Sequence, residues 1–235
     1  MYHSIIVSGR DLYREWGLIP TSRPVINPPE VKTTYVDLPA SDGGLDYTDI
    51  MLGRPPYGYR KGSWDFAVKS KRGGTGRWQE TFSSVMNYLH GVQHTIVLED
   101  DPDFYYTGRL NVNSWKSDKN HSTITIDYCL EPFRKSLKES DEEDWLWDDL
   151  FTKTIRYGTF RVEGQKYRNL LYAGIRPTVP VITCSESMTV DYNGSSYGLV
   201  SGENVNANLA LHYGDNIMLF HGDGIVTVKY REVSL

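Results

Sequence analysis

The residues of this chain that are able to bind a metal include a pair of histidines. His90 and His94 are four residues apart, a spacing that on one helix would place two imidazoles on the same face. However, Gly91 is expected to end the helix between them, and no third ligand is obvious nearby. We therefore interpret both as ordinary surface histidines and expect no metal site.

A second group with possible chemistry is the carboxylate run Glu99–Asp103. Paired carboxylates can act as a general acid and base, or they can bind calcium. The spacing does not match a calcium loop, and Asp-Asp-Pro-Asp is common turn chemistry. A turn is the favoured interpretation, and calcium binding or a carboxylate hydrolase is the alternative. The acidic run Glu139–Asp144 is interpreted with the same caution.

Motifs for nucleotide binding and for nucleophilic catalysis are incomplete. Gly73–Gly76 precedes a predicted helix, but it lacks the Lys-Ser/Thr of a P-loop and the spacing of a dinucleotide fingerprint. Gly194–Gly198 has the spacing Gly-x-Ser-x-Gly, but it follows the hairpin signal Asn193-Gly194 and no strand-to-helix elbow is predicted there. Neither Cys129 nor Cys184 lies in a nucleophile motif. We therefore expect no catalytic residue and no cofactor, and the chain is not expected to be an enzyme.

Two tyrosines offer a different binding chemistry. Tyr192 and Tyr197 flank an Asn193-Gly194 pair, and exposed rings in this position would stack on sugars. Tyrosine is also simply a good strand residue. Tyr192 and Tyr197 are therefore a candidate glycan-binding pair in an alternative hypothesis.

Composition excludes several broad classes of protein. The chain has 235 residues, 39% hydrophobic and 13% aromatic, and a formal net charge of −5. This balance favours a folded, sheet-rich protein and gives no general reason to bind nucleic acid. The one basic cluster, Lys69 to Arg72 with Arg77 nearby, is interpreted as a solvated turn.

Cysteine usage and hydropathy indicate a protein made in the cytoplasm. Two cysteines do not make a disulfide framework, so Cys129 and Cys184 are expected to be free thiols. The start of the chain lacks the regions of a signal peptide, and no apolar run is long enough to span a membrane.

The elements that would position these residues are mostly strands. Apolar and polar residues alternate over Tyr106–Ser114 and again over Thr123–Glu131, with a polar turn between them. Because successive side chains of a strand point to opposite faces, this pattern predicts a long antiparallel hairpin over Asp103–Pro132 that lies on a core. One helix is predicted over Trp78–His90, since apolar residues recur there at helical spacing.

The chain is therefore expected to be mainly β, all-β with one helix, in two domains. We place an N-terminal domain at 1–134, an acidic linker at 135–150 and a C-terminal β-sandwich at 151–235. The linker contains Trp145 and Trp147, which are expected to dock on a domain or on a neighbouring subunit.

Several short strands are predicted in the C-terminal domain. Asn193-Gly194 is the strongest hairpin signal. Alternation predicts strands over Val205–Tyr213 and Val226–Tyr230, and a buried strand over Ile217–Phe220. Gly222–Gly224 is expected to be a turn.

In the order of many segments and in their amino-acid sequences, the chain resembles the distal tail proteins of long-tailed phages that infect Gram-positive hosts. The similar segments cover nearly the whole chain: Leu45–Thr48, Tyr57–Arg60, Trp64–Phe66, Asn87–Gly91, Tyr105–Leu110, Ile124–Phe133, Asn169–Pro180, Gly214–Asn216 and Val226–Arg231.

The resemblance implies a structural virion protein at the tail tip. In this family six copies form a ring, and the N-terminal domain, a β-sheet or split-barrel-like ring domain, joins the tail tube to the tail-associated protein. The C-terminal domain is a galectin-like β-sandwich that points outward and either carries receptor-binding proteins or stays bare. The partners that the resemblance implies are therefore further copies of the chain, the tail tube protein, the tail-associated protein and, where the C-terminal domain carries them, receptor-binding proteins. The alternative hypothesis is a carbohydrate-binding module that grips a host cell-wall glycan with its C-terminal sandwich.

Overall fold

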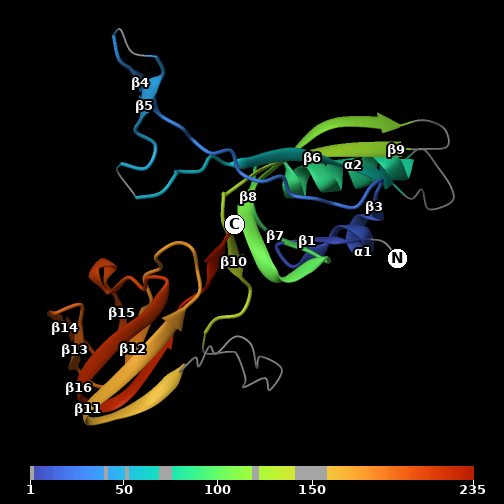
Figure 1. The fold of residues 1–235 in the computed structure, drawn as a ribbon. Coiled ribbons are helices and arrows are strands. Elements are labelled where there is room, and N and C mark those ends of the chain that lie inside the picture. Colours follow the sequence, from blue (N-terminus) through green and yellow to red (C-terminus); the bar gives the residue numbers. More distant parts are fainter. Residues whose placement is uncertain (1–2, 40–41, 51–52, 69–75, 118–121, 141–157) are drawn as a thin grey trace. The chain divides into compact units, whose positions relative to one another are not determined.

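The computed structural model describes residues 3–39, 42–50, 53–68, 76–117, 122–140 and 158–235 (Figure 1). The chain forms two compact units, Met1–Arg134 and Lys135–Leu235. Each unit has its own cluster of buried apolar side chains. The two units are described separately.

The first unit is built on one antiparallel sheet. Its strands follow the order β2-β1-β7-β8-β9-β6-β3. These strands are β1 (Ile5–Val7), β2 (Arg10–Asp11), β3 (Leu18–Pro20), β6 (Arg60–Val68), β7 (Gln93–Leu98), β8 (Asp101–Ser117) and β9 (Ser122–Leu130). A further short strand, β10 (Arg134–Ser136), lies at the boundary between the units.

The predicted hairpin over Asp103–Pro132 is present as β8 and β9. The pairing runs from Gly108↔Leu130 to Ser117↔Ser122, with a bulge between Val112 and Ser114. The apolar residues of the alternation lie on the buried face. The buried side chains of the two strands are Tyr106, Leu110, Val112, Ile124, Ile126, Tyr128 and Leu130.

Two α-helices are present in the described residues, so the expectation of one helix is wrong by one. Helix α2 (Gly76–Leu89) lies where apolar spacing predicts a helix, and it packs against β8 through its apolar stripe. The unexpected helix, α1 (Leu12–Trp16), has five residues. The Asp11 carboxylate accepts hydrogen bonds from two backbone N–H groups at its start, and Gly17 ends it with φ 69°. Helix α1 is too short to show a period in the sequence.

The mainly β class is confirmed, and no helix in the described ranges is long and apolar enough to cross a bilayer.

In the first unit a buried guanidinium fixes the loop that precedes an extended arm. Arg60 is 5% exposed and donates to the carbonyls of Pro132 (2.8 Å) and Asn27 (3.0 Å). Burial lowers the pKa of Arg60 and raises that of Tyr128, whose hydroxyl accepts from the Asn27 N–H.

The second unit is a set of antiparallel strands in the order β14-β13-β16-β12-β15, with β11 paired to β16. A 3-10 turn, Ala207–Leu209, follows β15. The strands of this sheet are β11 (Thr159–Tyr172), β12 (Val181–Cys184), β13 (Met188–Tyr192), β14 (Ser195–Leu199), β15 (Gly202–Val205) and β16 (Gly214–Lys229). Strand β17 (Val233–Ser234) lies outside this sheet and pairs with β10.

The predicted turn at Gly222–Gly224 is wrong, because β16 runs through it. Strand β16 pairs with β11 from Gly214↔Tyr172 to Thr227↔Thr159. Gly222 and Gly224 have φ 136° and 153°, and Gly164, opposite Gly222, has φ 68°. These glycines let the ribbon bend instead of reversing, so β16 pairs with β13 at one end and β12 at the other.

The predicted strand Val205–Tyr213 is also wrong beyond Val205. Asn206 caps the 3-10 turn, and its side chain accepts from the Asn208 N–H. Leu209 and Leu211 are nonetheless buried, because the turn places them in the core of the unit. The alternation of apolar residues therefore signalled burial without signalling a strand.

Asn216 is a buried polar residue that holds this part of the second unit. It is 3% exposed, and its amide donates to the carbonyls of Leu170 (3.1 Å), His212 (2.8 Å) and Gly214 (3.0 Å). Its Oδ1 accepts from the His212 N–H at 2.8 Å. One side chain thus joins β11 to the loop that leads into β16.

His94 is buried in the first unit and is held neutral. It is 5% exposed, with Nε2 3.0 Å from the Tyr88 carbonyl oxygen and Nδ1 3.0 Å from Ser8 Oγ. A carbonyl only accepts, so Nε2 carries the proton and Nδ1 accepts from the Ser8 hydroxyl. Burial lowers the pKa of His94, and the bond to Tyr88 opposes this shift.

We predict that His94 makes the first unit less stable in mild acid. The unfolded imidazole takes up a proton near pH 6.5, while the folded one stays neutral to lower pH. The free energy of unfolding should therefore fall as the pH drops below that value, and His94→Gln should weaken this fall. Urea unfolding at a series of pH values measures it. An unchanged pH dependence in His94→Gln would contradict the prediction.

We also predict that Asn216→Ala lowers the free energy of unfolding of the second unit by about 2–4 kcal/mol, because several buried groups lose their partner. Urea unfolding of the whole chain measures the loss, and hydrogen exchange in β16 assigns it to this unit. The matched control is Asn169→Ala, an exposed amide with one bond to Asp215, which should change stability by less than about 0.5 kcal/mol. Equal losses in the two variants would refute the role given to Asn216.

Candidate functional site

The histidines and carboxylates singled out by the sequence do not form a site. His94 is buried, so its expected place on the surface is wrong, while His90 is exposed and its Nδ1 accepts from the Val112 N–H at 3.1 Å. The described residues contain no cluster of three or more potential metal ligands.

The carboxylates of Glu99–Asp103 are held apart by separate partners. The Arg23 guanidinium 2.8 Å from Asp100 is the main cause that lowers the pKa of that carboxyl group. The expected turn is present at Glu99 and Asp100 only, because β8 begins at Asp101, and these contacts tie both to the surrounding sheet. The partners are the Ser4 N–H for Glu99, Arg23 and His3 for Asp100, and Arg134 for Asp101.

Some sequence expectations fall outside the described residues. They are the glycine-rich run up to Thr75, the basic cluster Lys69–Arg72, the acidic residues from Asp141 and the two tryptophans, Trp145 and Trp147. The described part of the expected linker, Lys135–Ser140, is hydrogen-bonded to the second unit. Ser140 is 3% exposed, and its Oγ accepts from the Tyr230 N–H at 3.1 Å.

The tyrosine pair proposed for glycan stacking is not a pair of exposed rings. Asn193 and Gly194 form the expected tight turn, with φ 51° and 78°. Tyr192, however, lies on the buried face of β13, is 3% exposed and has its hydroxyl 2.9 Å from the Ala210 carbonyl oxygen. Tyr197 is half-buried against the core. The prediction that Tyr192 is exposed is wrong, because strand alternation places it inward.

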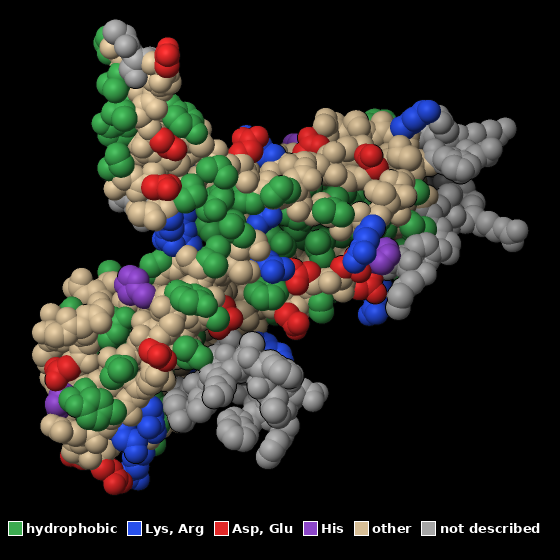
Figure 2. All heavy atoms as spheres, viewed as in Figure 1, with side chains coloured by type: hydrophobic (Ala, Val, Ile, Leu, Met, Phe, Trp, Pro, Cys, Tyr) green, Lys and Arg blue, Asp and Glu red, His purple; other side chains and the backbone are tan. Residues whose placement is uncertain are grey.

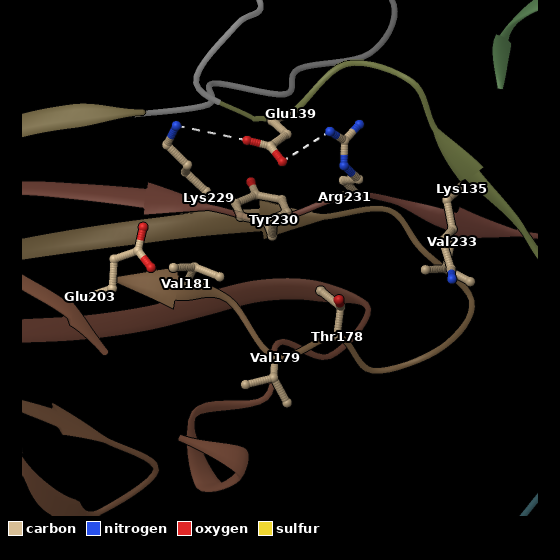
Figure 3. Close-up of a pocket in the computed structure, with 10 residues that line it drawn as sticks. All are labelled: Lys135, Glu139, Thr178, Val179, Val181, Glu203, Lys229, Tyr230, Arg231 and Val233. Carbon is tan, nitrogen blue, oxygen red and sulfur yellow. Dashed lines mark hydrogen bonds and ion pairs between the residues drawn. The ribbon is translucent and has the colours of Figure 1, made fainter. Parts of the chain in front are cut away.

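A hollow of about 500 Å³ lies on the second unit (Figure 3). Val179 and Val181 line one side of it, and Glu139 lies between Lys229 and Arg231. Glu139 Oε1 lies 2.9 Å from Arg231 Nη2, and Glu139 Oε2 lies 3.8 Å from Lys229 Nζ. These ion pairs hold Lys135–Ser140 against the end of β16. The charges of Glu139, Lys229 and Arg231 therefore have a structural role in the second unit.

The first unit carries a hairpin arm, Glu30–Gly58, that is the stronger candidate. Its base is closed by two backbone bonds of 2.8 Å, from Lys32 N–H to the Pro56 carbonyl and from Gly58 N–H to the Glu30 carbonyl. Beyond the base, β4 (Tyr35–Asp37) and β5 (Gly44–Asp46) pair with each other as a sheet of two strands (Figure 1). A hairpin of two strands is at best marginally stable alone in water.

Large apolar side chains of the arm are exposed to solvent, and Figure 2 shows them along the projection at the top of the view. None of them belongs to either buried cluster of the described residues. They are Val31 (49% exposed), Tyr35 (61%), Val36 (45%), Leu38 (42%), Leu45 (46%), Tyr47 (41%) and Ile50 (65%). So many exposed apolar side chains on one element mark an interaction surface.

The sequence contains a signal for this surface that alternation alone does not reveal. Tyr35, Val36, Leu45 and Tyr47 look like ordinary strand residues, but the flanking segments are rich in proline and glycine. Proline has no backbone N–H donor, so the flanking segments interrupt the strand pairing on both sides of the arm. The signal in the sequence is therefore the composition of the flanking segments and not the hydrophobicity of the strands.

Comparison with known proteins finds a likeness among solved structures. No family model matches the chain, and no curated protein matches it by sequence. Among solved structures, the chain is similar to the Dit (gp 19.1) protein of phage SPP1, described as a paradigm of the hub adsorption apparatus in phages that infect Gram-positive hosts. The likeness covers 100% of both chains with a TM-score of 0.65 and 14% sequence identity. At that identity the likeness establishes the fold, and the chain has the fold of this phage hub protein from end to end.

Proposed function

We propose that this chain is a structural hub protein of a phage tail, six copies of which form a ring at the tail tip. The observation that carries the proposal is the match of the whole chain, both units in order, to a protein of the phage adsorption apparatus. The function is assembly, and the proposal assigns the chain no reaction. Because fold alone does not fix function, a surface suited to assembly must support it.

The hairpin arm is that surface, and its proposed occupant is a second copy of the chain. Arm and recipient then lie on different faces of one subunit, and a head-to-tail contact of this kind forms a ring when the rotation between successive copies closes. Covering each apolar side chain of the arm contributes about 1 kcal/mol. The aspartates interleaved with them direct the arm toward a recipient with basic groups, because unlike charges attract across an interface. They are Asp37, Asp42, Asp46 and Asp49.

The remaining proposed partners are the proteins that a ring at the tail tip would contact. The first unit builds the ring, and rings can stack on one another. One side of the ring meets the tail tube protein, and the other meets the tail-associated protein. The second unit, with its separate core, is a module able to present receptor-binding proteins. Synthesis takes place in the host cytoplasm, and the assembled protein resides at the virion tail tip.

The alternative, a carbohydrate-binding module that uses Tyr192 and Tyr197, loses its site. Tyr192 is 3% exposed and its ring packs in the core. A sugar cannot stack on a ring that is covered on both sides. Tyr197 alone, half-buried, offers too little surface to define a site.

We predict that the double variant Tyr35→Ser, Ile50→Ser dissociates the ring. The two side chains are 61% and 65% exposed on the arm, so they contribute to association without contributing to a core. The concentration of half-dissociation should rise about 30-fold, because the two side chains together contribute about 2 kcal/mol. Light scattering of the wild type should give about six times the chain mass of 26.9 kDa, and the variant should approach the mass of one chain.

The matched control is Val205→Ser with Tyr213→Ser, which removes side chains of similar exposure, 69% and 78%, from the second unit. This variant should keep the mass of the wild type. Circular dichroism should show that all variants are folded. A wild type that remains a single chain at high concentration would refute the ring, and equal masses in wild type and arm variant would refute the role of the arm.

A further inference from the structure

The second unit has an exposed sheet face centred on Tyr167. Gln165, Tyr167 and Asn169 alternate along β11 and therefore point to one side. Register places Tyr167 opposite Leu219 and Asn169 opposite Ile217. The adjacent positions on the same face are His221, opposite Gln165, and Asp191, opposite Leu219 on the other side of β16. We call these seven residues the Tyr167 face.

The centre of the Tyr167 face is apolar. Tyr167 is 67% exposed and Ile217 is 60% exposed, while Leu219 between them is partly exposed. Their neighbours along each strand, such as Met218 and Phe220, point to the core and are fully buried. The centre is therefore a flat aromatic and aliphatic platform, much smaller than the contact surface of a stable protein–protein interface.

The rim of the Tyr167 face consists of groups held in place by hydrogen bonds. His221 Nε2 is 2.7 Å from Asp191 Oδ2, and Gln165 Nε2 is 3.1 Å from His221 Nδ1. On the other side of the tyrosine, the Asn169 amide donates to Asp215 at 2.7 Å. Gln165 and Asn169 remain exposed, so these contacts orient the amides and leave them accessible. Pre-oriented amides can donate to and accept from one ligand at low entropic cost.

Charge selects the class of ligand. The full charges at the rim are carboxylates, Asp191 and Asp215, and hydrogen bonds from Ser196 and His221 lower the pKa of Asp191. The cationic residues between the face positions of β11, Lys166 and Arg168, alternate to the other side of the strand. A phosphate-bearing or other anionic ligand would meet negative charge here, whereas a neutral polyol would not.

We propose that the Tyr167 face binds a neutral oligosaccharide, with one sugar ring stacked on Tyr167 and its hydroxyl groups bonded to Gln165 and Asn169. These amides are four residues apart, about 13 Å along the strand, which suits a short oligosaccharide. The ring faces of a sugar are apolar and its edge carries hydroxyls, which matches an apolar centre with an amide rim. Binding resides in the second unit and does not depend on ring assembly, although a ring would add avidity.

The test is binding of the whole protein to neutral oligosaccharides of glucose, galactose and N-acetylglucosamine, and to polyglycerol phosphate as the anionic probe. Saturation-transfer NMR identifies a ligand, and calorimetry at millimolar sugar measures its affinity. Tyr167→Ala should weaken binding at least about tenfold, because the stacking surface is lost. Tyr167→Phe should retain affinity within about twofold, since the ring remains.

Ile225→Ala is the matched control, because Ile225 is 50% exposed on the same side of β16 but lies beyond the bend at Gly222 and Gly224. It should leave the affinity unchanged. The proposal is overturned if no neutral sugar binds at millimolar concentration, if only the anionic polymer binds, or if Tyr167→Ala binds as well as the wild type. It is also overturned if Tyr167→Ala lowers the mass of the assembly, since the face would then be a contact between copies. None of these results bears on the arm variants.

Discussion

The structure depends on one constraint, which is that apolar side chains must be removed from water. Two clusters of buried residues satisfy it within the chain, one in each unit, and their strands alternate inward and outward accordingly. The hairpin arm does not satisfy it, because its large apolar side chains from Val31 to Ile50 that are named above are between 41% and 65% exposed. The cores of the two units are thus complete within the chain, and the proposed ring would cover the arm with a second copy.

The two units accommodate their longest strands in different ways. In the first, β8 and β9 stay in one sheet and a helix covers the buried face. In the second, β11 and β16 form a ribbon that bends at Gly164 and Gly222 and so contributes to pairings at both ends. A Cβ at Gly222 would lie 2.9 Å from the Met188 Cβ, so the bend also demands close packing. Glycine therefore marks a bend in this unit where short-range rules predict a turn.

Buried polar groups give the units their specific geometry. Arg60 and Asn216 each bond to backbone groups of more than one segment, and His94 bonds to the Tyr88 carbonyl and the Ser8 hydroxyl. Each of the three would be costly to bury without those bonds. They anchor, respectively, the loop before the arm, the end of α2 and the entry to β16. These three polar residues thus hold segments of the scaffold together.

The sequence by itself determined the class of fold, the long hairpin and the position of α2. Periodicity sufficed there, because the residues of one strand pair or one helix are neighbours in sequence, and the resemblance to distal tail proteins matches the fold that was found. Only the tertiary structure decided that Tyr192 is buried, that Tyr167 is exposed and that the arm lacks a cover. Alternation states which residues share a face, but which face meets the core depends on strands far away in the chain. The same limit explains Gly222, whose left-handed φ is compatible with a turn or a bend until β11 pairs across it.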